Sequence, residues 1–253
     1  MLAIIKYILK NAVRDRLYIG ILLSLIIAFA ISIFLGSTML VEQKQTATVF
    51  IAGSTRLILA IGMILFVCLS INRAFENKEV EFILAKAISR QKFVLSYFIG
   101  FVLTFLLVYL PVILAVYLFC KVNLIGYLFW SLTLILEIIL IIAFAVLVSL
   151  ILKNPLNSIM STFSFYMISR LMGMFVSAIV IPDNIEIAYR YWLPSALKML
   201  SVIFPRLDLF AQSSWLINNN SYQSMITIII LQFVIYLLLL ITMSFHDFKK
   251  KQF

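Results

Sequence analysis

The sequence has few charged residues: Asp, Glu, Lys and Arg make up 12% of its 253 residues. A soluble globular domain usually has about a quarter charged residues, whereas this chain is 64% hydrophobic and has a mean hydropathy of +1.15. This composition predicts an integral membrane protein. The net charge of +10 could suggest a nucleic-acid partner, but Lys and Arg are scattered at the ends of apolar runs. We therefore interpret them as determinants of membrane topology and expect no nucleic-acid partner.

Histidine, cysteine and glycine are also scarce, which limits the chemistry that the chain can perform. The one histidine, His246, follows the last apolar run, so a Ser/His hydrolase or a His-rich metal site lacks its parts. Cys68 and Cys120 belong to separate apolar runs and form neither a disulfide framework nor a metal-binding spacing. None of the seven glycines belongs to a G-x-x-x-x-G-K-[ST] motif. We predict that the chain is not an enzyme, and that any ATP and Mg are bound by a partner.

Long apolar runs predict the number of membrane-spanning helices. A hydrocarbon core about 30 Å thick needs about 20 apolar helical residues. Six segments qualify or nearly qualify, at about 17–41, 52–72, 93–119, 124–152, 156–181 and 224–245. The second is long enough only if it includes Arg56, which we expect to snorkel to the interface. The first is too long for a signal-peptide core and is expected to be a retained span.

Two other segments are expected to lie at the membrane surfaces. Residues 1–16 place Lys6, Lys10 and Arg14 at one-turn spacing, which predicts an in-plane helix; a simple extension of the first span is the alternative. Residues 182–222 contain an apolar run, 193–204, that is too short to cross, and this favours a re-entrant or interfacial half-helix. The aromatic residues expected in an interfacial belt there are Tyr189, Tyr191, Trp192 and Trp215.

Residues 73–92 form a dense charged segment between the second and third predicted spans. Together with residues 1–16, Lys153 and Lys249–Lys251, this segment contains most of the 20 Lys and Arg residues. The positive-inside rule therefore predicts that both termini and the charged segment face the cytoplasm, in a cell inner (plasma) membrane. The chain is expected to be one permease domain, 1–253, with spans one and two in 17–72, spans three to five in 93–181, the outer segment in 182–222, and span six with a basic tail in 223–253.

Helical spacing within residues 73–92 predicts a short amphipathic helix, although an ordinary polar loop is the alternative. One side of this helix collects Val80, Ile83, Leu84 and Ala87, whereas Glu79, Glu81, Lys86 and Arg90 surround the rest. Ser89 is predicted to cap the helix that begins the third span.

Glu137 and Arg170 are the charged residues expected nearest to mid-bilayer, where function is the default hypothesis. Each lies roughly 23 Å from the turn at Lys153, Asn154 and Pro155, so equal depth makes an ion pair feasible. A structural pair, a role at a dimer seam or substrate path, and snorkelling remain alternatives. Met160, Met167 and Met174 recur every seven residues, which favours core packing over a path for Cu(I).

The charged segment resembles the coupling-helix region of type-2 ATP-binding-cassette (ABC) permeases, which usually reads E-x-G-T-[LI]-E-x-L-L-[AS]-x-P-[IL]-[ST]-R. Glu76, Glu79, Glu81 and the run from Phe82 to Arg90 carry the resemblance. Lys78-Glu79 replaces Gly-Thr, and Ala87 stands where proline is usual. Residues 204–210, which include Phe204, Pro205 and Asp208, resemble an outer-segment signature of the family's copper-enzyme-maturation branch.

The resemblance implies a transport subunit that moves a substrate, in the export direction, with energy from ATP. A cytoplasmic ABC ATPase would receive the coupling helix, and a second permease copy or a paralogue would complete the path among membrane lipids. The residues expected to contact the ATPase are Glu79, Glu81, Phe82, Leu84, Ile88 and Arg90. A haem-exporter-like permease, an ion-coupled secondary carrier using Glu137, and a membrane scaffold remain alternatives.

Overall fold

The computed structural model describes residues 2–38, 43–85, 89–120, 124–152, 154–178, 204–217 and 223–250, and within these ranges it contains helices but no β-strand. The helices are α1 (Leu2–Arg14), α2 (Arg16–Ser37), α3 (Gln43–Glu76), α4 (Glu79–Ala85), α5 (Arg90–Cys120), α6 (Leu124–Ile151), α7 (Pro155–Ala178), η1 (Leu207–Leu209), η2 (Ser213–Leu216) and α9 (Gln223–Lys250). Five of them, α2, α3, α5, α6 and most of α9, are long and apolar enough to cross a membrane. The chain is therefore an all-α, multi-pass membrane protein.

The helix boundaries agree with most of the predicted spans. The exception is the second span, predicted at 52–72, because α3 is one continuous helix of 34 residues that begins at Gln43. α7 matches the start of the fifth predicted span, but residues 179–181 lie outside the described residues. The apolar run at 193–203 also lies outside them, as do Tyr189, Tyr191 and Trp192.

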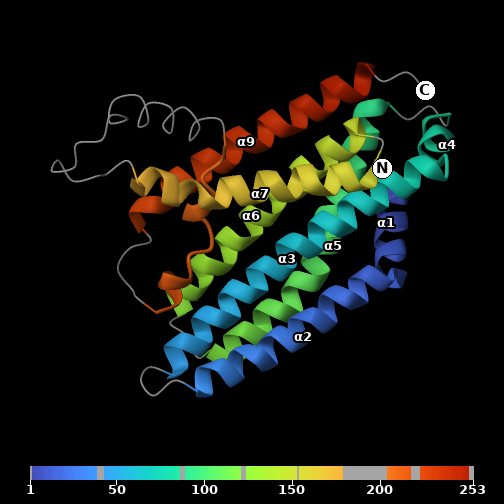
Figure 1. Ribbon diagram of the computed structural model, residues 1–253. Coiled ribbons are helices and arrows are strands. Elements are labelled where there is room, and N and C mark those ends of the chain that lie inside the picture. Colours follow the sequence, from blue (N-terminus) through green and yellow to red (C-terminus); the bar gives the residue numbers. More distant parts are fainter. Residues whose placement is uncertain are drawn as a thin grey trace.

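The amino-terminal helix α1 is separate from α2 rather than an extension of it. Asp15 has an extended backbone, with φ −77° and ψ 134°, and its side chain accepts a hydrogen bond from the Leu17 N–H at 3.1 Å. An N-cap of this kind begins a new helix. Figure 1 shows α1 lying across the end of the bundle, where it packs against α5. A side chain at Gly100 would meet Ile8 at 2.8 Å, so this glycine lets α1 approach α5 closely.

The connection between α6 and α7 is the predicted tight hairpin. α6 ends at Ile151 and α7 begins at Pro155, a residue well suited to the first position of a helix because it needs no amide donor there. The Asn154 side chain accepts a hydrogen bond from the Leu156 N–H at 2.9 Å. This short turn makes α6 and α7 antiparallel neighbours, which brings residues at equal distances from the turn to similar depth.

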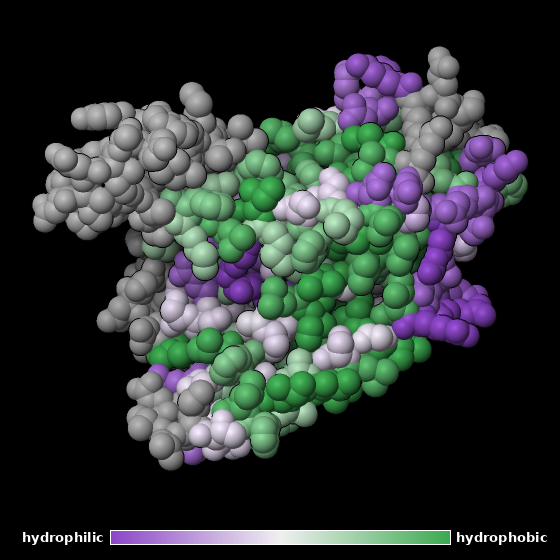
Figure 2. Space-filling model, viewed as in Figure 1, coloured by the Kyte–Doolittle hydropathy of each residue, from purple (hydrophilic) through white to green (hydrophobic). Residues whose placement is uncertain are grey.

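The two ends of the bundle differ in composition. α6 is buried over most of its length, whereas α2 and α9 expose most of their apolar side chains, as expected for helices that face lipid. The amino terminus, the carboxyl terminus and α4 gather at one end of the bundle (Figure 1), and hydrophilic surface is prominent at that end (Figure 2). The segment with η1 and η2 packs against α3, α6 and α7 far from α4.

Candidate functional site

Glu137 and Arg170 form the ion pair that their equal depth predicted. The Arg170 Nη1 atom lies 3.7 Å from Glu137 Oε1, and Glu137 is fully buried. Glu137 accepts no hydrogen bond from any residue in the described ranges. The attraction of the arginine is therefore the main compensation for a buried carboxylate, whose isolation would be costly.

Arg170 also anchors the segment 204–217. Its Nη1 atom donates hydrogen bonds to the carbonyl oxygens of Leu207 and, at 2.9 Å, Phe210. The Leu207 carbonyl oxygen also accepts from the Phe210 N–H at 3.1 Å within the 3₁₀ turn, whereas the buried Phe210 carbonyl follows that turn and receives its hydrogen bond from Arg170. Arg170 thus has a second role that the sequence did not predict: it holds residues 204–217 against the bundle.

Arg56 does not snorkel as predicted. Its Nη1 atom donates to the carbonyl oxygen of Ala211 at 3.1 Å, inside the protein. The Ala211 N–H in turn donates to Thr133 Oγ1 at 3.1 Å. Ala211 has a left-handed backbone with φ 44°, so these two bonds hold a strained residue in place. The prediction was wrong because a backbone carbonyl from a segment 155 residues away lies within reach.

The predicted outer-segment residues occupy distinct environments. Phe204 packs against Phe165 with ring centroids 6.0 Å apart, and Pro205 is buried. Asp208 pairs with Arg206, whose Nη2 atom lies 2.9 Å from Asp208 Oδ2. Phe204 therefore helps to hold the segment on α7, whereas the Arg206–Asp208 pair lies within the segment itself.

Trp215 lies in the core and not in the predicted interfacial belt. It is 1% exposed, because η2 packs on the beginning of α6. A Cβ atom at Gly126 would lie 2.1 Å from the Trp215 carbonyl oxygen, so only glycine permits this contact. Because the η2 backbone lies close against Gly126, the Trp215 indole is buried. The sequence had indicated an interface because tryptophan is amphipathic.

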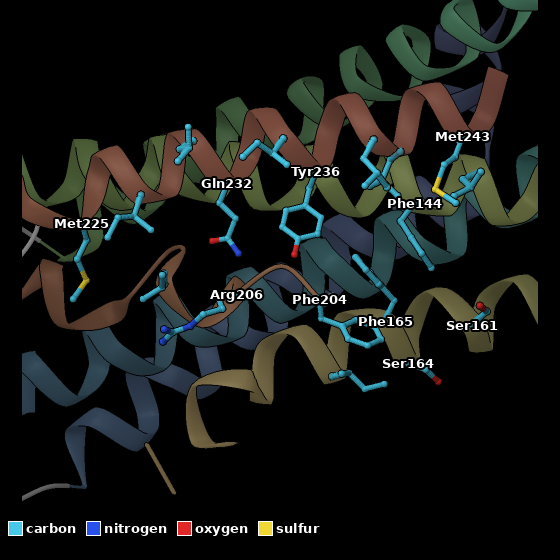
Figure 3. A pocket seen from close by; sticks show the side chains of 18 residues that line it. Phe144, Ser161, Ser164, Phe165, Phe204, Arg206, Met225, Gln232, Tyr236 and Met243 are labelled. Atoms are coloured by element: carbon cyan, nitrogen blue, oxygen red, sulfur yellow. The ribbon is translucent and has the colours of Figure 1, made fainter. Parts of the chain in front are cut away.

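A large apolar groove separates α7 from α9. Its volume is about 1380 Å³, and its floor includes Phe144 and Leu147 of α6. Figure 3 shows Arg206 and Gln232 on opposite sides of the groove, which also contains Phe165 and Tyr236. Most of the lining is hydrophobic, and no sequence pattern had indicated this groove, because its two walls are formed by helices far apart in the chain.

The charged segment contains the predicted short helix, α4, at the end of the bundle shared with both termini. Val80 is buried and Ile83 is partly buried against the core, whereas Glu81 and Phe82 are exposed. The amphipathic pattern therefore has the predicted inner side. Lys86, Ala87 and Ile88 lie outside the described residues, as does the side chain of Leu84.

Glu79 connects α4 to α1. The Tyr7 hydroxyl donates a hydrogen bond to Glu79 Oε1 at 3.0 Å. Partial burial and this hydrogen bond to a carboxylate raise the pKa of Tyr7 above its ordinary value. A separate contact at this end of the bundle joins α3 to the start of α2: the Arg73 Nη1 atom lies 2.9 Å from Asp15 Oδ2. Sequence reasoning missed Tyr7, because its role depends on how α1 crosses the bundle.

Arg90 connects the beginning of α5 to the end of α9. Its Nη1 atom donates to the carbonyl oxygens of Phe248, at 3.3 Å, and Lys249, at 2.8 Å. A cation is favourable at a helix carboxyl terminus, where carbonyl groups lack helical partners. The Phe93 and Phe248 rings stack nearby with centroids 5.3 Å apart. Ser89 caps α5 as predicted, accepting from the Lys92 N–H at 3.4 Å.

Lys78 adopts a conformation that usually favours glycine. Its φ is 56°, in the turn between α3 and α4. This is the position at which the resembled coupling-helix pattern has glycine. A residue with a Cβ atom is strained in this left-handed conformation, so Lys78 is a strained position of the turn.

The methionine stripe of α7 is not a core feature as predicted. Met160 and Met174 are exposed, and only Met167 packs partly against the core. Seven-residue spacing identified a common face but could not determine which way that face points. In the described ranges, no three His, Cys, Asp or Glu residues are grouped closely enough to hold a metal ion.

Comparison with known proteins identifies no family for this chain. No protein-family model matches the chain, and no curated protein matches it significantly.

Proposed function

We propose that this chain is the membrane-spanning subunit of an ABC transporter, which moves a substrate, in the export direction, using ATP hydrolysed by a separate cytoplasmic subunit. The observation that carries the proposal is α4. This short helix joins two long apolar helices at the basic end of the bundle, buries Val80 and exposes Glu81 and Phe82. A helix held on one side and exposed on the other is suited to enter a groove of a partner.

The proposed topology has six spans. Five are the helices that are long and apolar enough to cross a membrane, and the sixth is α7, whose described residues are less apolar. Its antiparallel packing on α6 supports this assignment, since α6 is apolar enough to cross. We place α4 and both termini at the cytoplasmic face of the plasma membrane by the positive-inside rule. α1 then lies in the plane of that face, and residues 182–222 belong to the outer face with the expected re-entrant run.

Contacts around α4 supply a route for transmitting movement. α4 follows α3 after a two-residue turn, Glu79 bonds Tyr7 of α1, and Arg90 bonds the last turn of α9. A displacement of α4 by the ATPase would therefore act directly on α3 and α1, while Arg90 joins the next helix along the chain, α5, to α9. Rigid-body coupling of this kind is a known way to convert a local change into a change of the pathway.

The secondary-carrier alternative is less well supported. A coupling carboxylate must exchange an ion with a water-accessible path, but Glu137 is fully buried beside Arg170 and does not line the groove between α7 and α9. A haem-exporter-like permease would use the same contacts at α4, and a second copy or a paralogue is expected to complete either permease.

The first experiment tests which side of the membrane α4 occupies. Phe82→Cys and Gln43→Cys place single thiols near opposite ends of α3, in a chain whose Cys68 and Cys120 are replaced by Ser. A membrane-impermeant maleimide should label Cys at 82 in inside-out vesicles and Cys at 43 in intact cells. Labelling with the opposite sidedness would refute the proposed topology and, with it, the docking of a cytoplasmic ATPase.

The second experiment tests the partner. The chain, purified from its native membrane in mild detergent, should retain a subunit that carries a G-x-x-x-x-G-K-[ST] motif and hydrolyses MgATP. Glu81→Lys should reduce the retained ATPase at least tenfold, because charge reversal in an interface costs several kcal/mol and about 1.4 kcal/mol already weakens binding tenfold. Glu76→Lys, which makes the same change in total charge at the end of α3, serves as the matched control. Equal retention in both variants would contradict docking through α4.

A further inference from the structure

The groove between α7 and α9 is too large and too apolar to be an incidental packing defect. Its volume of about 1380 Å³ exceeds the range of roughly 300–1,000 Å³ typical of small-molecule sites. The α9 residues that line it recur at helical spacing from Met225 to Met243, a length of about 27 Å. The groove thus extends along α9 for nearly the thickness of a bilayer.

The charge of the groove lies in one half of it. Arg206 and Gln232 lie in the half that adjoins η1, as Figure 3 shows, whereas the other half contains Met243 and the uncharged Ser161 and Ser164. Gln232 Oε1 is buried and has no hydrogen-bond partner in the described ranges. Arg206 holds Asp208 through its Nε and Nη2 atoms, and its remaining Nη1 atom is the donor that a groove ligand would use.

We propose that this groove binds an anionic phospholipid, with its acyl chains along α9, its phosphate at Arg206 and a hydroxyl group of its headgroup at Gln232. Lipid chains are as apolar as the groove wall, so burial alone gives no preference for a particular lipid. The arginine guanidinium donates charge-assisted hydrogen bonds to the phosphate oxygens of any phospholipid. Its positive charge then favours a headgroup that has no cation of its own, which is the source of the preference for an anionic lipid. The buried Gln232 Oε1 atom is an acceptor and needs a donor, which the hydroxyl groups of a glycerol headgroup supply.

A second copy of the chain is the competing occupant, and the shape of the groove argues against it. A helix inserted between α7 and α9 would bring an apolar face to Gln232 and to the side of Arg206 that Asp208 does not occupy, leaving the buried Gln232 Oε1 atom without a partner. A phospholipid satisfies both side chains. This inference is independent of the proposed ATP-driven transport, since it concerns binding to the chain alone.

The experiment is native mass spectrometry of the full chain in detergent, titrated with phosphatidylglycerol or with phosphatidylcholine of the same acyl composition. One phosphatidylglycerol should bind about tenfold more tightly than phosphatidylcholine, because both lipids offer a phosphate but only phosphatidylcholine also brings a choline cation next to the Arg206 guanidinium. Arg206→Gln should remove that preference while retaining weak binding of both lipids, and Arg206→Lys should keep most of it.

Neighbouring leucines of α9 provide a matched control for the location. Leu239 lines the groove and Leu238 does not, yet both are exposed. Leu239→Trp should fill the groove and reduce phosphatidylglycerol binding at least tenfold, whereas Leu238→Trp should leave it unchanged. Equal binding by the two variants, or no preference for phosphatidylglycerol in the wild type, would overturn the proposal. A loss of dimer in Leu239→Trp without loss of lipid would assign the groove to a second copy instead.

Discussion

Replacing Arg170 by Leu tests whether the buried ion pair stabilises the fold. The change leaves Glu137, which is fully buried, without its ion-pair partner. Breaking a buried pair by removing one partner costs about 3–5 kcal/mol. The change also removes one donor from each of the carbonyl groups of Leu207 and Phe210, which lie in fully buried residues. Leu207 O still accepts from the Phe210 N–H at 3.1 Å, so the penalty of about 1–3 kcal/mol for an unsatisfied buried group applies to the Phe210 carbonyl.

The double variant Glu137→Leu with Arg170→Leu separates these contributions. It retains the loss at the two carbonyl groups but no longer strands a carboxylate in the core. We therefore expect the double variant to be more stable than Arg170→Leu by about 2 kcal/mol, within the range of coupling energies for contacting residues. For a chain of this length, that difference corresponds to a melting temperature higher by about 4–8 °C.

Cys68 provides the assay, because it is completely buried and its thiol becomes reactive only on unfolding. A fluorogenic maleimide can follow this exposure during heating in detergent, in a Cys120→Ser background. Arg73→Leu is the control, since it breaks an exposed ion pair with Asp15 and should cost less than about 1 kcal/mol. Equal losses for Arg170→Leu and the double variant would refute the reasoning, because they would show that Glu137 gains nothing from Arg170.

Other perturbations address single contacts, each measured with the same thermal assay. Lys78→Gly should stabilise the chain by about 0.5–1 kcal/mol, since the native φ of 56° strains a side chain; an unchanged or lower melting temperature would contradict this. Gly126→Ala should cost about 1–3 kcal/mol through its clash with the η2 backbone, whereas Gly53→Ala, where a methyl group meets nothing within 4 Å, should not destabilise. The wild-type chain should lose stability as pH rises above about 10, and Tyr7→Phe should lose less over the same range. The raised Tyr7 pKa means that the unfolded chain loses this proton first, so the hydrogen bond to Glu79 contributes at lower pH and is lost as pH rises. An identical alkaline decline in both proteins would refute that role.

The sequence alone determined the features that depend on local spacing. Apolar runs located the long helices, because hydrocarbon thickness imposes a minimum length on any span. Helical period indicated the inner side of α4, and the Ser89 cap followed from the chemistry of free amides at a helix start. Counting residues from the α6–α7 turn predicted that Glu137 and Arg170 lie at the same depth, since in a tight hairpin the depth of a residue follows from its distance from the turn along the helix.

Tertiary structure decided what happens between segments remote in the chain. Arg56 and Trp215 have residue types typical of an interface, but a backbone segment docked on Gly126 provides a carbonyl partner for one and buries the other. The outward face of the α7 methionines and the groove along α9 depend on which neighbours cover each helix. A period specifies that residues share a face, whereas only packing specifies what that face meets, because packing energies come from partners that the local sequence does not contain.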